Sequence, residues 1–232
     1  MRRFCLATST LDFTLVRAER GHTISRAALA VYLFSICMIL GGIVLAPADH
    51  PTRWFEEKQT LTSYSAALLY TGSIVCFFNC LATRQLRYLG MSSVRENKFW
   101  ALGSIGFFVL MADEYFVMHE GIGRFFTYRV LNLPHSGVID RLDAFVIGAY
   151  GAVGLILLVR PWRDLANIPG FIGFLTMGAA MATVSLVFDL GEDGVSRLYI
   201  EDGAKIMANA SFLLACTTGA NSYYRQLAAR LR

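Results

Sequence analysis

Three short segments place acidic residues where an apolar block of the chain meets polar sequence. They are residues 112–120, 188–194 and 201–205. Their ionisable side chains are Asp113, Glu114, His119, Glu120, Asp189, Glu192, Asp193, Glu201, Asp202 and Lys205. Because ionisable groups at membrane depth are costly, they usually face a bundle interior or a cavity. We therefore expect these segments to meet and to form the site where this protein does its chemistry.

Carboxylates that lie close together need a proton, a cation or a basic side chain, since like charges disfavour ionisation. Arg197 and Lys205 are too few to offset the acids of these segments. One histidine among many carboxylates favours calcium, magnesium or manganese as a bound divalent cation over zinc. If residues 113–120 form one helix, Asp113 and Glu120 share a face. The predicted metal ligands are Asp113, His119, Glu120, Asp189, Asp193, Glu201 and Asp202.

A cation at this position would activate a bound water, and His119 or Glu114 would act as the general base. One reaction that such a site would support is hydrolysis of a lipid-like substrate at the outer membrane surface. The sequence itself names no reaction, so the prediction is limited to cation binding. The same acids are also typical of solvated helix ends, and Glu201 and Asp202 suit the first turn of a helix. Lys205 is equally explained by an ion pair to Glu201 or Asp202.

The elements that must position these residues are six apolar blocks. Hydrophobic residues make up 55% of the 232 residues and charged ones 16%, below the roughly 25% typical of soluble domains. A membrane span needs about 20 apolar residues. The blocks are residues 27–46, 62–82, 99–118, 144–159, 170–190 and 201–223. The sequence predicts an all-α, six-helix transmembrane domain over 27–224, with cytoplasmic segments at 1–26 and 225–232.

Orientation follows from the basic residues, which are enriched on the cytoplasmic side of membrane proteins. With the N-terminus inside, 14 of the 21 Lys and Arg residues fall inside, whereas 13 of the 17 acids fall outside. This pattern predicts a multipass protein of the bacterial inner membrane with both termini in the cytoplasm. Its expected partners are membrane lipids and other membrane-protein subunits. The bases flank spans and form no stripe, which argues against nucleic acid.

The chain has five cysteines, and four of them lie inside apolar blocks. No pair lies in a loop exposed to an oxidising compartment, so the sequence predicts no disulfide. Cys76 and Cys80 are four residues apart and share a helix face. Buried cysteine usually behaves as a small apolar residue.

The pattern Asp-Glu-x4-His-Glu at Asp113–Glu120, followed by Glu201-Asp202 and Lys205, resembles uncharacterised bacterial multipass membrane proteins. That resemblance covers the third to sixth blocks and implies no known activity. A fainter likeness is to membrane hydrolases of the ceramidase and adiponectin-receptor type, which hold zinc among histidines in a helical bundle. Here the last block has no His-x3-His, and His119 is the histidine beside a span.

Three functions stay open from the sequence. The first is a cation-binding site at the outer ends of the third, fifth and sixth spans, with metal-dependent hydrolysis as its activity. The second is a non-catalytic subunit or scaffold of a larger membrane complex. The third is proton or ion transport, which is ranked last because no span is broken by Gly or Pro at mid-depth.

Overall fold

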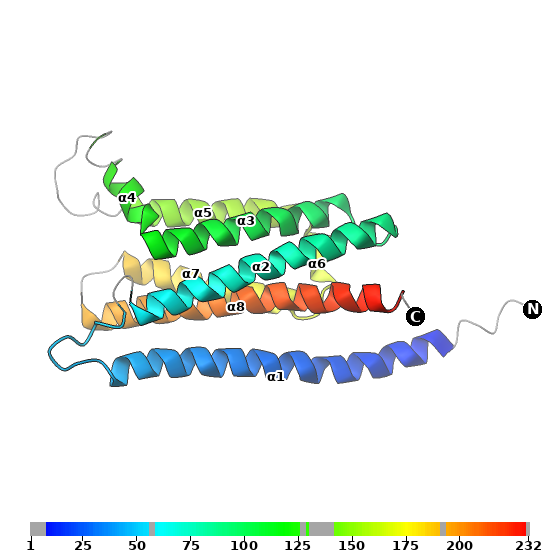
Figure 1. The fold of residues 1–232 in the computed structure, drawn as a ribbon, viewed down its shortest axis with the longest axis horizontal. Helices are drawn as coiled ribbons and strands as arrows, with labels where there is room; N and C mark the ends of the chain where they lie inside the picture. Colours follow the sequence, from blue (N-terminus) through cyan, green and yellow to red (C-terminus); the bar gives the residue numbers. More distant parts are fainter. Residues whose placement is uncertain (1–7, 56–58, 126–128, 130–141, 191–193, 231–232) are drawn as a thin grey trace, which may run out of the picture.

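The protein folds as a bundle of helices. The structure is a computed structural model that describes residues 8–55, 59–125, 129, 142–190 and 194–230. The helices are α1 (Thr8–Val44), α2 (Thr60–Tyr88), α3 (Val94–Phe116), α4 (Met118–Phe125), α5 (Leu142–Val159), α6 (Trp162–Ala166), α7 (Phe171–Asp189) and α8 (Val195–Ala228). Figure 1 shows the long helices lying side by side, with the start of α1 and the end of α8 at the same end of the bundle.

Among the residues that the structure describes, four helices are long and apolar enough to cross a membrane: residues 26–44 of α1, and α2, α3 and α7. Large apolar side chains point outward from these helices, as Leu33, Phe34, Phe77 and Ile105 do. Exposed apolar surface on this scale is typical of a face that contacts lipid tails. The chain is therefore an all-helical membrane protein in its described part.

Two of the six expected spans are not among these four. The apolar part of α5, residues 146–159, is shorter than the four others. The last helix, α8, does not reach the same hydropathy, because it carries polar residues along its length. These residues are tolerated because α8 is the most enclosed helix, with buried positions from Gly203 to Tyr223. It packs against α7, α2 and α1, so its polar side chains meet protein rather than lipid.

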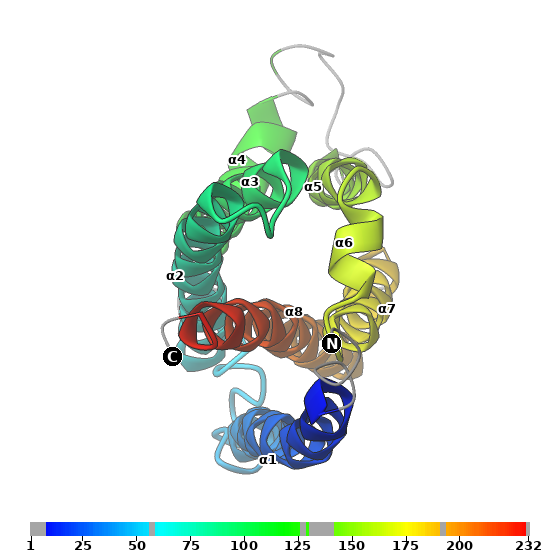
Figure 2. The same cartoon turned by 90° about the vertical axis from the view of Figure 1, so that its right-hand side faces the viewer.

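The end view of the bundle shows which helices surround the polar side chains of α8. Helices α2, α3, α5, α7 and α8 form a ring, and α1 lies outside it against α8 (Figure 2). Helices α2 and α8 run in the same direction, since Ser65 contacts Asn209 and Cys76 contacts Cys216. Gly219 on α8 lets both neighbouring helices pack closely, because a Cβ there would lie 2.8 Å from the Trp100 ring on α3 and 3.1 Å from Asn79 Nδ2 on α2.

The four described cysteines are free. The sulfur atoms of Cys76 on α2 and Cys216 on α8 are 3.3 Å apart. This contact shows that α2 and α8 pack closely at that point. Cys80, one turn further along α2, lies beside α3, where Asn97 donates to its carbonyl oxygen at 2.6 Å.

Candidate functional site

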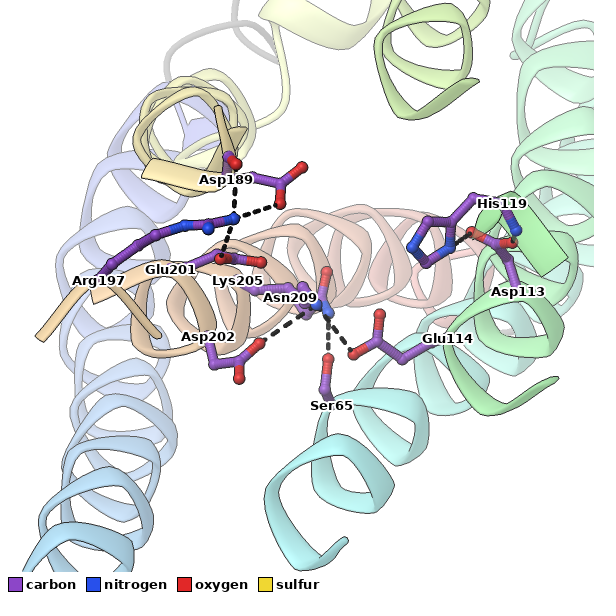
Figure 3. A network of polar contacts seen from close by, with 10 residues as sticks. All are labelled: Ser65, Asp113, Glu114, His119, Asp189, Arg197, Glu201, Asp202, Lys205 and Asn209. Carbon is purple, nitrogen blue, oxygen red and sulfur yellow. Dashed lines mark hydrogen bonds and ion pairs between the residues drawn. The ribbon is translucent and has the colours of Figure 1, made fainter. Parts of the chain in front are cut away.

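The three acidic segments come together at the end of the bundle where α3 and α7 end and α8 begins (Figure 3). We call this group the charged cluster. Its described members are Asp113, Glu114, His119, Asp189, Arg197, Glu201, Asp202 and Lys205. These carboxylates and bases come from four helices, α3, α4, α7 and α8. The cluster therefore exists only when these helices are packed together.

An interruption of the helix at Val117 brings His119 into contact with Asp113. Helix α3 ends at Phe116, and Val117 has the left-handed conformation, with φ 59° and ψ 43°. A β-branched residue rarely adopts this conformation, so the turn is strained. One Asp113 carboxylate oxygen then accepts the backbone N–H of His119 at 2.6 Å, and the other lies 3.0 Å from its Nδ1. Asp113 thereby caps α4 and orients the imidazole.

This break corrects the helix geometry that the sequence indicated. Asp113 and Glu120 were expected on one face of a continuous helix, but they lie in α3 and α4, on either side of Val117. The side chain of Glu120 is outside the described part of the chain. The same holds for the whole of Glu192 and Asp193, of which Asp193 was an expected metal ligand.

Lys205 links α8 to α3. Its Nζ lies 3.2 Å from Asp202 Oδ1 on its own helix and 3.7 Å from Glu114 Oε1 on α3. The ion pair between Lys205 and Asp202 was one of the two pairs that the sequence allowed. The contact with Glu114 is between helices, and it fixes the start of α8 against the end of α3.

Arg197 joins the end of α7 to the start of α8. Its Nε donates to the carbonyl of Phe188 at 2.7 Å, and Nη2 donates to the carbonyl and to Oδ1 of Asp189 at 2.5 and 3.0 Å. The same Nη2 lies 3.6 Å from Glu201 Oε2. A guanidinium at a helix C-terminus satisfies the last carbonyl groups and favours the helix dipole. Arg197 thus has a structural role that the sequence pattern did not single out.

Just below the charged cluster, a neutral pair continues the polar contacts into the bundle. Asn209 on α8 donates from Nδ2 to Ser65 Oγ on α2 at 2.8 Å, and both residues are buried. Such hydrogen bonds hold membrane helices together because lipid offers no alternative partner.

Charge in the cluster is unbalanced. Five carboxylates, of Asp113, Glu114, Asp189, Glu201 and Asp202, lie among two permanently basic side chains and one histidine. Within the described residues, no three His, Cys, Asp or Glu side chains are grouped so that they could hold a metal ion. The zinc-binding set implied by the likeness to membrane hydrolases is therefore not matched by that part of the chain.

The contact between Asp113 and His119 can do acid–base chemistry. A carboxylate at Nδ1 holds the imidazole in the tautomer with the proton on Nδ1, which makes Nε2 the basic nitrogen. The same arrangement orients the histidine of hydrolytic triads. Asp113 is 7% and His119 16% exposed in their side chains, so the pair is largely screened from bulk water.

A second polar group lies at the opposite end of the bundle and was missed in the sequence. Tyr223 donates to Glu96 Oε1 at 2.5 Å and accepts from Trp100 Nε1 at 2.9 Å, and Ser92 donates to Glu96 Oε2 at 2.7 Å. The available signal was Ser93-x-x-Glu96, the pattern of a helix N-terminus. Ser93 is indeed the N-cap of α3 and accepts from the Glu96 backbone N–H at 3.1 Å. We call Ser92, Ser93, Glu96, Asp164 and Tyr223 the hydroxyl-bound cluster.

Comparison with known proteins places the chain in one family. It belongs to the family described as Domain of unknown function (DUF8692), which matches residues 27–219. No curated protein and no solved structure matches the chain. The matched region begins with the first apolar block and contains the whole of the charged cluster.

Proposed function

For this member of a family without an assigned activity, we propose a six-span membrane enzyme whose charged cluster hydrolyses a lipid-like ester by acid–base chemistry. The observation that carries the proposal is the double contact of Asp113 with the backbone N–H and Nδ1 of His119. Besides the four long apolar helices, the count includes α5 as the fourth span and α8 as the sixth. The excess of Lys and Arg at the end opposite the charged cluster supports a cytoplasmic location for both termini in a bacterial inner membrane.

The direction of the helices supports six spans. Helix α8 runs parallel to α2, and α3 runs antiparallel to both. Along α2 and α3, Ser73 contacts Ser104 and Cys80 contacts Asn97. Along α3 and α8, Trp100 contacts Tyr223 and Glu114 contacts Lys205. An alternating up-and-down path from α1 to α8 gives α2 and α8 the same direction only if α5 also crosses. The short apolar length of α5 is compatible with crossing where flanking residues lie at the interface.

In this reaction His119 Nε2 removes a proton from a water molecule as the water oxygen attacks the ester carbonyl carbon. The carbon–oxygen bond to the leaving alcohol then breaks, and the proton passes from Nε2 to the alkoxide. Asp113 stays ionised and stabilises the imidazolium that forms between these steps. Products are a carboxylic acid and an alcohol.

Lys205 and Glu114 have supporting roles. Glu114 is paired with Lys205 and holds the lysine at the end of α3. The Lys205 ammonium is one-third exposed and can donate to negative charge that develops on a carbonyl oxygen. Figure 3 shows Glu114 and His119 on the side of α3 and α4 that faces α8.

The position of the cluster at a span end supports an amphiphilic substrate. Exposed apolar residues surround it, namely Tyr115 and Phe116 at the end of α3 and Val187 and Leu190 at the end of α7. Acyl chains in the membrane can pack against these side chains while the polar headgroup reaches the charged cluster.

The test is hydrolysis of p-nitrophenyl octanoate by the full chain in detergent micelles. His119→Asn keeps an amide nitrogen where Nδ1 lies, so it retains the contact with Asp113 but has no Nε2. We expect the rate above the micelle background to fall by about 100-fold or more. His50→Asn, which changes an exposed histidine outside the charged cluster, is the matched control. Equal rates for the His119→Asn variant and wild type would overturn the proposal.

Cation binding is the second candidate, and the charge imbalance of the cluster favours it. Calcium, magnesium or manganese would be held by carboxylates such as Asp202 and Glu201 after side-chain rearrangement. Each ion should then raise the melting temperature of the wild type, and less so that of Asp202→Asn. If neither ester hydrolysis nor stabilisation by these ions is found, a non-catalytic subunit of a membrane complex becomes the best reading.

A further inference from the structure

A cavity opens at the end of the bundle that faces the viewer in Figure 2, where α3 begins, α6 lies and α8 ends. Its volume is about 410 Å³. Pockets that bind small molecules typically measure about 300–1,000 Å³. The cavity lies at the opposite end from the charged cluster and is therefore a separate place in the fold.

The lining of this cavity is mostly polar and carries negative charge. Two carboxylates contribute, Glu96 from α3 and Asp164 from α6, and none of the lining residues is Lys, Arg or His. The other polar side chains are Ser92, Ser93, Asn167, Ser222, Tyr223 and Gln226. A ligand that fits must bring hydrogen-bond donors and positive charge.

Neutral donors hold both carboxylates in place without cancelling their charge. Glu96 is 7% exposed and accepts from the hydroxyls of Ser92 and Tyr223, one at each oxygen. Asp164 Oδ2 accepts from Ser93 Oγ at 2.9 Å. An ionised carboxylate has about four acceptor positions, so each keeps capacity for a further donor. Neither carboxylate has an ion-pair partner among the described residues.

We propose that this cavity binds a ligand that carries a primary ammonium group. Such a group offers three N–H donors and one positive charge, which matches two fixed carboxylates flanked by neutral amides and hydroxyls. A quaternary ammonium has no donor and depends on aromatic faces, and Tyr223 is the one aromatic residue of the lining. The ethanolammonium group meets this chemistry, either as the free amine or as the headgroup of phosphatidylethanolamine.

The experiment measures the melting temperature of the full chain against ligand concentration. One arm adds ethanolamine to the protein in detergent and compares it with choline at equal ionic strength. The other arm compares nanodiscs of phosphatidylethanolamine with nanodiscs of phosphatidylcholine. Asp164→Asn is the test variant, because Asp164 is exposed and its loss leaves the core intact, and Asp49→Asn is the matched exposed control.

We expect the primary amine to stabilise wild type and Asp49→Asn more than the quaternary amine does in at least one arm. Asp164→Asn should weaken the apparent affinity by about tenfold or more. A response to ethanolamine alone identifies a soluble amine, and a response to the lipid alone identifies the headgroup. Equal stabilisation by choline, no response in either arm, or an unchanged response of Asp164→Asn would overturn the proposal. The outcome does not depend on His119 or on hydrolysis.

Discussion

The two ends of the bundle stabilise clustered carboxylates in different ways. Each gathers carboxylates from helices that are distant in sequence. The charged cluster compensates them with Lys205, Arg197 and His119, whereas the hydroxyl-bound cluster holds Glu96 with Tyr223 and Ser92. Charge partners reduce the net charge of a site, but hydroxyl partners only fix its geometry.

This difference separates what the ends can do. At the charged cluster, ion pairs tie α3, α7 and α8 together, and removing one partner leaves an uncompensated charge. At the hydroxyl-bound cluster, the carboxylates have neutral hydrogen-bond partners and leave room for a cation. The first arrangement suits positioned acid–base groups, and the second suits binding. Four substitutions, in order of decreasing effect, test this contrast.

Lys205→Met should have the largest effect. It removes the base between Glu114 and Asp202 and leaves their carboxylates facing each other. We expect the free energy of unfolding to fall by about 2–4 kcal/mol, below the full range for buried pairs because Lys205 is 32% exposed. Unfolding in mixed micelles with increasing SDS measures the loss. Lys98→Met, at an exposed position of α3, should change stability little. An equal loss in both variants would show that the cluster does not depend on its lysine.

Tyr223→Phe tests the opposite end. The change keeps the ring but removes the hydroxyl that donates to Glu96 and accepts from Trp100. Because Glu96 is buried, we expect a loss of about 1.5–3 kcal/mol, typical of a hydrogen bond to a charged group. Tyr224→Phe, the next residue but an exposed one, is the control and should lose much less. An equal loss of stability in Tyr223→Phe and Tyr224→Phe would contradict this prediction.

Asp113→Asn should have an intermediate effect. Asparagine can still accept the backbone N–H of His119, but it loses the charge that holds the imidazole. We expect a loss of about 1–2 kcal/mol in SDS unfolding. Hydrolysis should fall as well, because the ring is no longer fixed in one tautomer. Stability that matches wild type would mean that the charge of Asp113 does not stabilise its contact with the His119 ring.

Ser65→Ala should have the smallest effect. It removes the acceptor of Asn209 Nδ2 just below the charged cluster. Interhelical hydrogen bonds of this kind contribute about 0.6–1 kcal/mol in membrane proteins. The same unfolding assay, with the exposed Ser63→Ala as control, measures the difference. A loss as large as that of Lys205→Met would erase the distinction between neutral and charged contacts.

The sequence predicted the apolar elements well, because hydropathy reports directly on contact with lipid. The blocks at 62–82, 99–118 and 170–190 correspond to α2, α3 and α7. Helix α2 continues to Tyr88, past the end of the predicted block at Ala82, because residues 83–88 are mostly good helix formers and Leu86 among them is buried. The last block was harder to judge, since α8 owes its stability to burial rather than to hydropathy.

The site was predicted in composition but not in geometry. Sequence spacing assumes a continuous helix, and no residue near Val117 is a glycine or proline that would mark a break. The turn depends on Asp113 capping α4, which is a contact that spacing along one helix excludes. The partners of Glu96 were not predictable for a related reason, because Tyr223 is 127 residues away and the contact exists only once α3 and α8 are packed.

The parallel pairing of α2 and α8 has a consequence for biogenesis. Contacts between Cys76 and Cys216 join residues that are synthesised 140 positions apart, so α2 enters the membrane long before its polar face has a partner. Helix α8 in turn carries Asn209 and Thr218 in its buried face, and leaving the translocon into lipid alone would be unfavourable for it. The earlier helices, once assembled, therefore provide the polar contacts that α8 needs inside the membrane. A chain that stops before Val195 would leave Ser65 and Asn79 of α2 without the partners that α8 provides.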